Sequence, residues 1–146
     1  MDILSKYLSI DGLRNDPSQR LIIQELSLLQ SHLTTLDKNE NRFIKIGFKK
    51  REKWDNKGMY LWGDVGRGKT FLMDVFFETL DIKKKKRLHF HHLLDEIHEA
   101  IKLTKNIENP IEDFVKNIAK EVRVMCFDEF YIEYIADAMI LSKLLE

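Results

Sequence analysis

The chain has 146 residues, of which 44% are hydrophobic and 33% charged, a composition typical of one folded globular domain and not of a disordered chain. Its 24 Lys and Arg residues balance its 24 Asp and Glu residues, so net charge gives no reason to expect nucleic acid or an anionic membrane as a partner. The single cysteine, Cys126, excludes an internal disulfide, and because no apolar run approaches the ~18 residues of an integral membrane segment, we expect a cytoplasmic protein.

The first predicted helix begins at Asp16, an N-cap residue followed by Pro17 and then by Gln19 three positions after the cap. Behind this start, apolar residues recur at steps of three and four and form one stripe: Ile22, Leu26, Leu29, Leu33 and Leu36. The stripe lasts for about two heptads, too few for a coiled coil, so we expect it to pack on a core. Residues 37–57 are polar and are predicted to form an irregular, solvated connector.

Short apolar segments then alternate with helical patterns along the chain. Three of these segments are predicted to be buried strands: Met59–Trp62, Arg87–Phe90 and Val122–Phe127. Helices are predicted between and after them, over Lys69–Leu80, over His91–Leu103 and from a capping box at Asn109–Glu112 toward Glu121. Strands and helices that alternate in this way predict an α/β fold, in which helices flank a parallel sheet.

The segment between the first predicted strand and its helix reads GDVGRGKT and matches the phosphate-binding pattern G-x-x-x-x-G-K-[ST]. The residues expected to bind the nucleotide are Gly63, Asp64, Val65, Gly66, Arg67, Gly68, Lys69 and Thr70. Glycines allow the positive φ angles that bring backbone N–H groups to the phosphates at the positive end of the helix. We expect Lys69 to act on the β- and γ-phosphates as a catalytic residue, and Thr70 to bind Mg²⁺. A glycine turn without a ligand is the alternative.

A second motif, MCFDEF, ends a predicted strand in two acids, Asp128 and Glu129. Asp128 is expected to hold the Mg²⁺ shell, and Glu129 to orient and polarise the attacking water as a catalytic residue. Two acids at a strand end are, by themselves, more often a helix cap or a solvated turn. Their position after a phosphate loop favours the functional interpretation, and it predicts ATP and Mg²⁺ as the ligands.

Other candidate residues have simpler explanations. His89, His91 and His92 cluster, and strand alternation predicts His89 and His91 on one face, but no Cys or carboxylate lies at ligand spacing, which disfavours a metal site. Lys83–Lys86 is expected to solvate the turn between a helix and a strand, and the balanced charge disfavours a nucleic-acid patch there. We expect Cys126 to be buried in its strand and not to act as a nucleophile.

With these residues placed, the chain resembles the ZapE-like family of AAA+-related P-loop ATPases found in bacterial cell division and in mitochondria. The resemblance rests on Asp16 with Gln19, Gly58–Asp74, Arg87–His91, His98–Glu99, CFDEF, and Ile135–Leu141. It implies an AAA+-like sheet and an ATP-hydrolysing, oligomer-forming protein. In bacteria such proteins associate with the division ring protein FtsZ at the inner face of the membrane, and mitochondrial relatives are linked to turnover of respiratory-chain subunits.

The chain departs from the family pattern in three ways. Asp64 stands where a small residue is usual and places a negative charge near the phosphates, and Tyr134 stands where an aspartate is usual. Related ATPases also continue beyond the acidic strand, whereas the last arginine here is Arg123. An arginine finger is worth about 10³–10⁵ in rate. We therefore expect one partial domain over 1–146, incomplete at its C-terminus and weakly active alone, with a helix and connector over 1–57 and a nucleotide-binding core over 58–146.

The hypothesis that follows is an ATPase whose phosphate loop and Asp128 hold Mg-ATP, and whose turnover does work on a protein partner. A nucleotide-binding module without turnover is one alternative, and a DNA-acting loader ATPase is another. A GTPase is disfavoured, because no glycine follows Gly68 and a D-x-x-G switch element is therefore absent. A small-molecule kinase fits less well, since kinases of this size need an arginine-rich lid after the loop.

Overall fold

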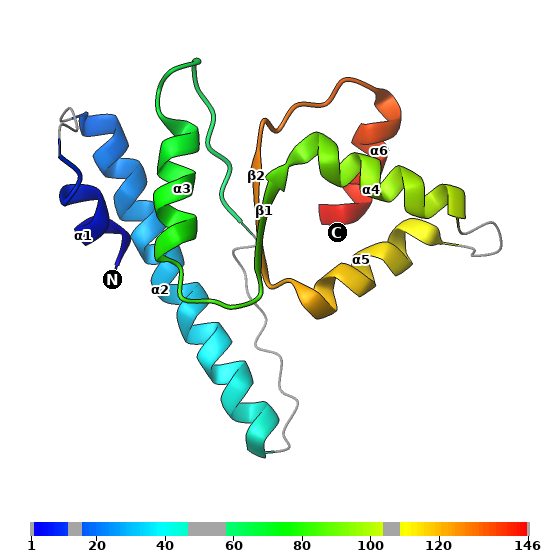
Figure 1. The fold of residues 1–146 in the computed structure, drawn as a ribbon, viewed down its shortest axis with the longest axis horizontal. Helices are drawn as coiled ribbons and strands as arrows, with labels where there is room; N and C mark the ends of the chain where they lie inside the picture. Colours follow the sequence, from blue (N-terminus) through cyan, green and yellow to red (C-terminus); the bar gives the residue numbers. More distant parts are fainter. Residues whose placement is uncertain (1, 12–15, 47–57, 104–108, 146) are drawn as a thin grey trace. The chain divides into compact units, whose positions relative to one another are not determined.

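The computed structural model describes residues 2–11, 16–46, 58–103 and 109–145. The chain divides into two compact units, Met1–Ile82 and Lys83–Glu146. The first contains helices, and the second contains helices and a small sheet (Figure 1). The predicted boundary between the connector and the core, after residue 57, lies outside the described residues.

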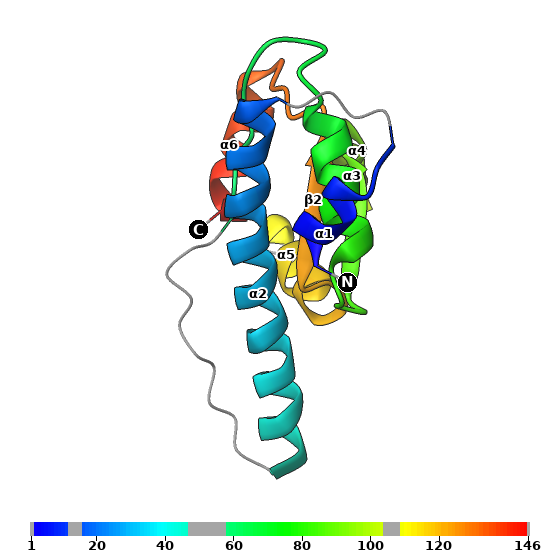
Figure 2. The same cartoon turned by 90° about the vertical axis from the view of Figure 1, so that its left-hand side faces the viewer.

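The first unit consists of three helices that all contact one another (Figures 1 and 2): α1 (Ile3–Leu8), α2 (Pro17–Ile46) and α3 (Lys69–Thr79). Helix α1, which the sequence analysis did not predict, begins where Asp2 accepts a hydrogen bond from the Ser5 N–H at 2.9 Å. Helix α2 begins at Pro17 as predicted, and the Asp16 carboxylate accepts a hydrogen bond from the Ser18 N–H at 2.8 Å. Local capping chemistry therefore sets both starts.

Helix α2 is longer than predicted, because it continues from Asp37 to Ile46, where the sequence analysis expected an irregular connector. The polar residues of this stretch include lysine, glutamate and arginine, which are good helix formers, and no glycine or proline interrupts the chain between Pro17 and Gly47. The prediction of an irregular connector is therefore wrong for residues 37–46, because high polarity alone does not prevent a helix. The rest of the predicted connector, residues 47–57, lies outside the described residues.

The helices of the first unit share an apolar core, which includes Ile3 and Tyr7 of α1, Ile23, Leu26 and Leu33 of α2, and Leu72, Val75 and Phe76 of α3. Gln30 of α2 is also buried, with 7% of its surface exposed. Its Oε1 accepts a hydrogen bond from the Ile3 N–H at 3.0 Å, and its Nε2 donates to the Thr79 carbonyl at 2.7 Å. One buried amide therefore joins all three helices.

The predicted strand at Met59–Trp62 is wrong, because residues 58–64 have no regular secondary structure. A strand exists only as part of a hydrogen-bonded ladder, and the sheet formed by the described residues contains two other strands. The side chains of Tyr60 and Trp62 are 65% and 82% exposed. A short apolar run indicates a tendency to be buried, but it does not identify a pairing partner.

The second unit contains a parallel pair of strands and three helices: β1 (Lys85–His89), α4 (Phe90–Leu103), α5 (Pro110–Glu121), β2 (Val124–Asp128) and α6 (Ile135–Leu145). The register pairs Lys85 with Val124 at one end and His89 with Asp128 at the other. Both strands were predicted within two residues of their observed bounds, and α4 connects them together with α5, as a parallel crossover requires. The prediction of an α/β fold is confirmed at this level.

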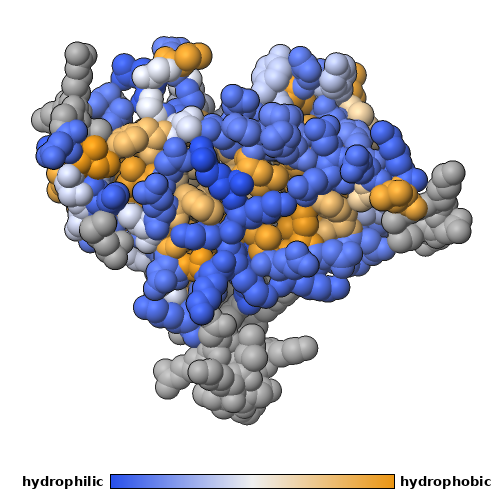
Figure 3. Space-filling model, in the orientation of Figure 1, coloured by the Kyte–Doolittle hydropathy of each residue, from blue (hydrophilic) through white to orange (hydrophobic). Residues whose placement is uncertain are grey.

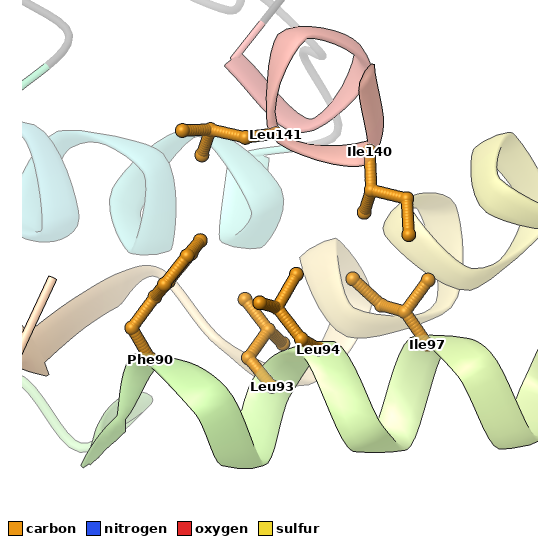
Figure 4. Close-up of a cluster of buried hydrophobic side chains, with 6 residues drawn as sticks. All are labelled: Phe90, Leu93, Leu94, Ile97, Ile140 and Leu141. Atoms are coloured by element: carbon orange, nitrogen blue, oxygen red, sulfur yellow. The ribbon is translucent and has the colours of Figure 1, made fainter. Parts of the chain in front are cut away.

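The core of the second unit lies between its helices. Figure 4 shows Phe90, Leu93, Leu94 and Ile97 of α4 pointing toward Ile140 and Leu141 of α6. Half-buried side chains of α5 pack against the same cluster, and Figure 3 shows hydrophobic residues as a band between the hydrophilic residues of α4 and α5. Helix α6 was not predicted, although its sequence is the IADAMIL segment that carries part of the family resemblance.

Helix α5 begins at Pro110 with Asn109 as its N-cap residue, as predicted, but the Asn109 side chain makes no capping hydrogen bond. The predicted capping box is therefore not formed. Glu112 instead pairs with Lys116 at 2.7 Å, and this hydrogen bond lowers the pKa of the Glu112 carboxyl. No helix within the described ranges has the length and apolar character that crossing a membrane requires.

Candidate nucleotide-binding site

The phosphate loop connects an extended segment to the first turn of α3. Gly66 and Gly68 have φ angles of 79° and 80°, as predicted, and Gly63 has a φ of 144°. Gly68 is the N-cap residue of α3 and offers no side-chain cap to the helix, whose first backbone bond runs from the Leu72 N–H to the Gly68 carbonyl at 2.9 Å. A glycine-capped helix start of this kind suits an anion, because the helix dipole favours negative charge at that end.

Lys69 closes the loop on itself. Its Nζ donates to the carbonyl oxygens of Gly63 and Asp64, each at 2.8 Å. An ammonium group has three N–H donors, so these bonds use two of them and a third can point to a phosphate oxygen. Asp64 takes part through its carbonyl and not through its carboxylate, and Val65 at the tip of the loop is 99% exposed. The loop is therefore shaped by its own lysine and is accessible from solvent.

The start of α2 also contacts the loop, which the sequence analysis did not foresee. The Gln19 Nε2 donates to the Arg67 carbonyl at 3.2 Å, and a carboxylate oxygen of Asp16 lies 3.5 Å from the Arg67 guanidinium. Gln19 was interpreted as part of a helix-start signal, but its Oε1 accepts a hydrogen bond from the Tyr7 hydroxyl at 3.0 Å. The contact of Gln19 with Arg67 spans 48 residues of sequence, and that of Asp16 with the same residue is longer still, so local patterns could not reveal them.

The two acids lie at the end of β2, as predicted. Asp128 is the last residue of the strand, and its Oδ1 accepts a hydrogen bond from the Glu129 N–H at 3.0 Å. The side chain of Asp128 is 18% exposed and that of Glu129 is 70% exposed. Glu129 has a φ of 51°, which is uncommon outside glycine. The backbone therefore turns sharply at the residue that the motif marks as catalytic.

Two basic side chains of β1 face these acids. The Arg87 guanidinium lies 3.4 Å from a carboxylate oxygen of Asp128, and Nδ1 of His89 lies 3.9 Å from a carboxylate oxygen of Glu129. The register places His89 directly opposite Asp128 and Arg87 opposite Cys126, so both basic residues lie near the end of the sheet that carries the acids. These partners could not be predicted from the sequence, because strand register cannot be deduced from a single short strand.

The histidines and lysines in and next to β1 contact one another or neighbouring side chains. The rings of His89 and His91 stack with their centroids 5.6 Å apart, although His91 belongs to α4 and not to a strand. Within the ranges that the structure describes, no three His, Cys, Asp or Glu residues are grouped to hold a metal. In the lysine run, Lys86 lies in β1 and pairs with Glu96 at 3.2 Å.

Cys126 is buried in β2, with 8% of its surface exposed, as predicted. Burial raises the pKa of its thiol to about 11. Because the thiolate is the nucleophilic form of cysteine, this residue is not a nucleophile at neutral pH.

The predicted Mg²⁺ ligands Thr70 and Asp128 lie in different compact units, the first beginning α3 and the second ending β2. Binding of one Mg²⁺ ion by both residues stays a prediction. Within its own unit, each half of the predicted site has the contacts described above: a glycine loop closed by Lys69, and a pair of acids with basic neighbours.

Comparison with known proteins adds independent information. A family model described as AFG1-like ATPase matches residues 3–146. The cell division protein ZapE of Escherichia coli K12 is 42% identical over 90 residues, which cover 62% of this chain and 24% of ZapE. Lactation elevated protein 1 homolog B of Danio rerio is 40% identical over 101 residues, which cover 62% of this chain and 20% of that protein. The chain thus matches about a quarter or less of these relatives, and no solved structure matches it.

Proposed function

The chain belongs to the AFG1-like ATPase family, as its resemblance to ZapE-like proteins predicted, and on this premise we propose that it binds ATP with Mg²⁺ and hydrolyses it. The observation that carries the proposal is the glycine loop before α3, closed by the two hydrogen bonds of Lys69. In this proposal the phosphates bind to the backbone N–H groups of the loop, and the AAA+-like sheet of the family holds the loop and the acidic strand end together.

The side chains assigned to Mg²⁺ have suitable chemistry. Thr70 offers a hydroxyl oxygen and Asp128 a carboxylate oxygen, and Mg²⁺ prefers oxygen ligands that it shares with the phosphates of its nucleotide. The bound ion would neutralise charge on the phosphates during transfer. Asp128 is only 18% exposed at its side chain, so its carboxylate is partly shielded from water, which strengthens its attraction for a cation.

Glu129 is assigned to the attacking water. Its carboxylate is 70% exposed and therefore open to solvent, and its place directly after Asp128 would keep it beside the metal. A carboxylate in this position orients a water by accepting a hydrogen bond from it. The Nδ1 atom of His89 lies 3.9 Å from this carboxylate, which is too far for a direct hydrogen bond.

The cellular role is proposed from the relatives. Because ZapE is named as a cell division protein, we propose that ATP turnover does work on a protein partner of the division apparatus, for which the family resemblance suggests an FtsZ-like protein. We also propose a homo-oligomer located in the cytoplasm, at the inner face of the membrane when bound to its partner. Nucleic acid is not expected as a partner, since basic and acidic residues are equal in number.

Mg-ATP titration followed by measurement of phosphate release tests the activity. We expect saturable binding to the wild type, lost in Lys69→Ala and kept in Lys83→Ala, which removes the same charge at an exposed position outside the loop. Glu129→Gln should keep binding and lose phosphate release. Absence of saturable binding to the wild type would contradict the proposal, and binding without multiple turnover would favour the alternative of a nucleotide-binding module.

A further inference from the structure

Gln19 lies in α2, yet its side chain is bonded to the phosphate loop. Its Nε2 donates to the Arg67 carbonyl at 3.2 Å, and its amide is packed closely against Gly68. A Cβ atom added to Gly68 would lie 2.9 Å from the same nitrogen, closer than real Cβ atoms approach their neighbours. The amide of Gln19 therefore occupies the space beside the turn that leads into α3.

The hydrogen bond to Arg67 has a consequence for the next residue. The carbonyl of Arg67 and the N–H of Gly68 belong to one planar peptide unit, and in a trans peptide these two groups point in opposite directions. All peptide bonds in the described ranges are trans. By holding the Arg67 carbonyl, Gln19 therefore fixes the direction of the Gly68 N–H, which is one of the donors of the phosphate loop.

The orientation of the Gln19 amide is itself determined by its neighbours. A backbone carbonyl can only accept, so the NH₂ end of the amide must face Arg67, and the Oε1 end is left to accept from the Tyr7 hydroxyl at 3.0 Å. Tyr7 is 2% exposed and its ring also contacts Phe71 in the first turn of α3. Helix α1 therefore supports Gln19 from the side away from the loop carbonyl.

Resting on the proposed function, we propose that Gln19 is a positioning residue of the nucleotide site. It sets the peptide between Arg67 and Gly68 for phosphate binding, and Tyr7 acts through it. The ion pair between Asp16 and Arg67 at 3.5 Å joins the same helix start to the same loop residue through a second, independent contact. Nucleotide affinity is then controlled in part by how α1 and the start of α2 dock beside the loop.

The test compares three glutamines of α2. Gln19→Leu removes both hydrogen bonds of the amide, and Gln19→Glu keeps the acceptor for Tyr7 but places an oxygen against the Arg67 carbonyl. Gln24→Leu makes the same chemical change at an exposed position on the same helix. Gln30→Leu breaks the bonds that join α2 to Ile3 and Thr79 and removes no hydrogen bond to the loop itself. For each variant, the Kd for Mg-ATP and the unfolding midpoint without nucleotide are measured.

We expect both Gln19 variants to raise the Kd about tenfold, the typical effect of one lost hydrogen bond with a partner left unsatisfied. Gln30→Leu should lower the unfolding midpoint and raise the Kd less than either Gln19 variant, because it loosens α1 but removes no bond to the loop. Gln24→Leu should change neither quantity. If Gln19→Leu bound Mg-ATP with the wild-type Kd, or if Gln30→Leu weakened binding equally, the role of Gln19 would be wrong. Failure of the wild type to bind would instead overturn the proposed function.

A double-mutant cycle tests the part played by Tyr7. Tyr7→Phe removes only the hydroxyl and should raise the Kd a few-fold, which is less than the effect of Gln19→Leu. Because Tyr7 acts through Gln19, the double variant should have the same Kd as Gln19→Leu alone. Additive effects of the two substitutions on the Kd would contradict this order of action.

Discussion

The guanidinium of Arg87 lies 3.4 Å from a carboxylate oxygen of Asp128, so that the proposed Mg²⁺ ligand has a cation beside it on the neighbouring strand. Two cations that share one carboxylate repel each other. In the proposed site, Arg87 therefore opposes Mg²⁺ at Asp128 while it holds the carboxylate in place.

This ion pair predicts how Arg87 affects the metal. Arg87→Met should lower the Mg²⁺ concentration that half-saturates ATP binding by a few-fold, because the competing charge is removed. Lys86→Met is the matched control, since Lys86 lies next to Arg87 in β1 but pairs with Glu96. The measurement is ATP binding as a function of Mg²⁺ concentration at constant ionic strength. An unchanged midpoint in Arg87→Met would show that the two cations do not compete.

Alanine substitutions at three glycines separate two costs of adding a side chain, which are backbone strain at positive φ and steric crowding by Gln19. The positions are Gly58, Gly66 and Gly68. Alanine at Gly66 would have an unfavourable φ of 79° but free space, whereas alanine at Gly68 would have a φ of 80° and a contact of 2.9 Å with Gln19. We expect Gly66→Ala to cost about 1–2 kcal/mol of stability and Gly68→Ala to cost more. Gly58→Ala, with neither problem, is the control. Chemical unfolding measures all three variants, and equal costs at Gly66 and Gly68 would exclude crowding by Gln19.

The second unit depends on a contact between α4 and α6. Nε2 of His98 lies 3.1 Å from a carboxylate oxygen of Asp137, whose residue is 7% exposed. Asp137→Ala should lower the free energy of unfolding by about 0.5–1.5 kcal/mol, because the hydrogen bond to His98 is lost, while the His98 side chain, 41% exposed, can bond to water instead. Asp137→Asn keeps an oxygen acceptor and should cost less, and Asp95→Ala on the exposed face of α4 should cost little. Thermal unfolding followed by circular dichroism ranks these variants. A different order would show that the contact of Asp137 with His98 does not stabilise the second unit.

The buried thiol predicts a loss of stability at alkaline pH. Burial raises the pKa of Cys126 from its ordinary value of 9.0 to about 11. As pH rises, the unfolded chain therefore loses this proton before the folded chain does. The contribution of the buried neutral thiol to the free energy of unfolding is intact below pH 9.0 and is lost as pH rises toward 11. The free energy of unfolding of the wild type, relative to Cys126→Ala, should fall by about 1 kcal/mol between pH 8 and pH 10. Parallel curves for the two proteins would contradict the burial of this thiol.

Patterns that depend on neighbouring residues were predicted well from the sequence. The start of α2 at Pro17 follows from the capping chemistry of Asp16, and the start of α3 at Lys69 follows from the phosphate-loop motif. The positive φ at Gly66 and Gly68 follows from the same motif. Each of these features is determined within about four residues of sequence, which is the range over which a helix end or a tight turn is specified.

Several features that depend on distant partners were not predicted. The apolar run Met59–Trp62 was expected to be a strand, but a strand requires a ladder that the run does not itself encode. The contact of Arg87 with Asp128 spans 41 residues, and the contact of Gln19 with Arg67 spans 48. Both arise from register and helix docking, which are decided by the whole core and not by a local pattern.

The hydroxyl of Tyr7 links helix α1 to the phosphate loop through Gln19. Coupling free energies are reciprocal. If the docking of α1 strengthens nucleotide binding through Gln19, bound nucleotide must therefore stabilise the docking of α1 by the same free energy. The six-residue helix then reports occupancy of the loop, and its amide protons should exchange with solvent more slowly when ATP is present. A fluorophore attached near Asp2 would follow loading of the protein in real time.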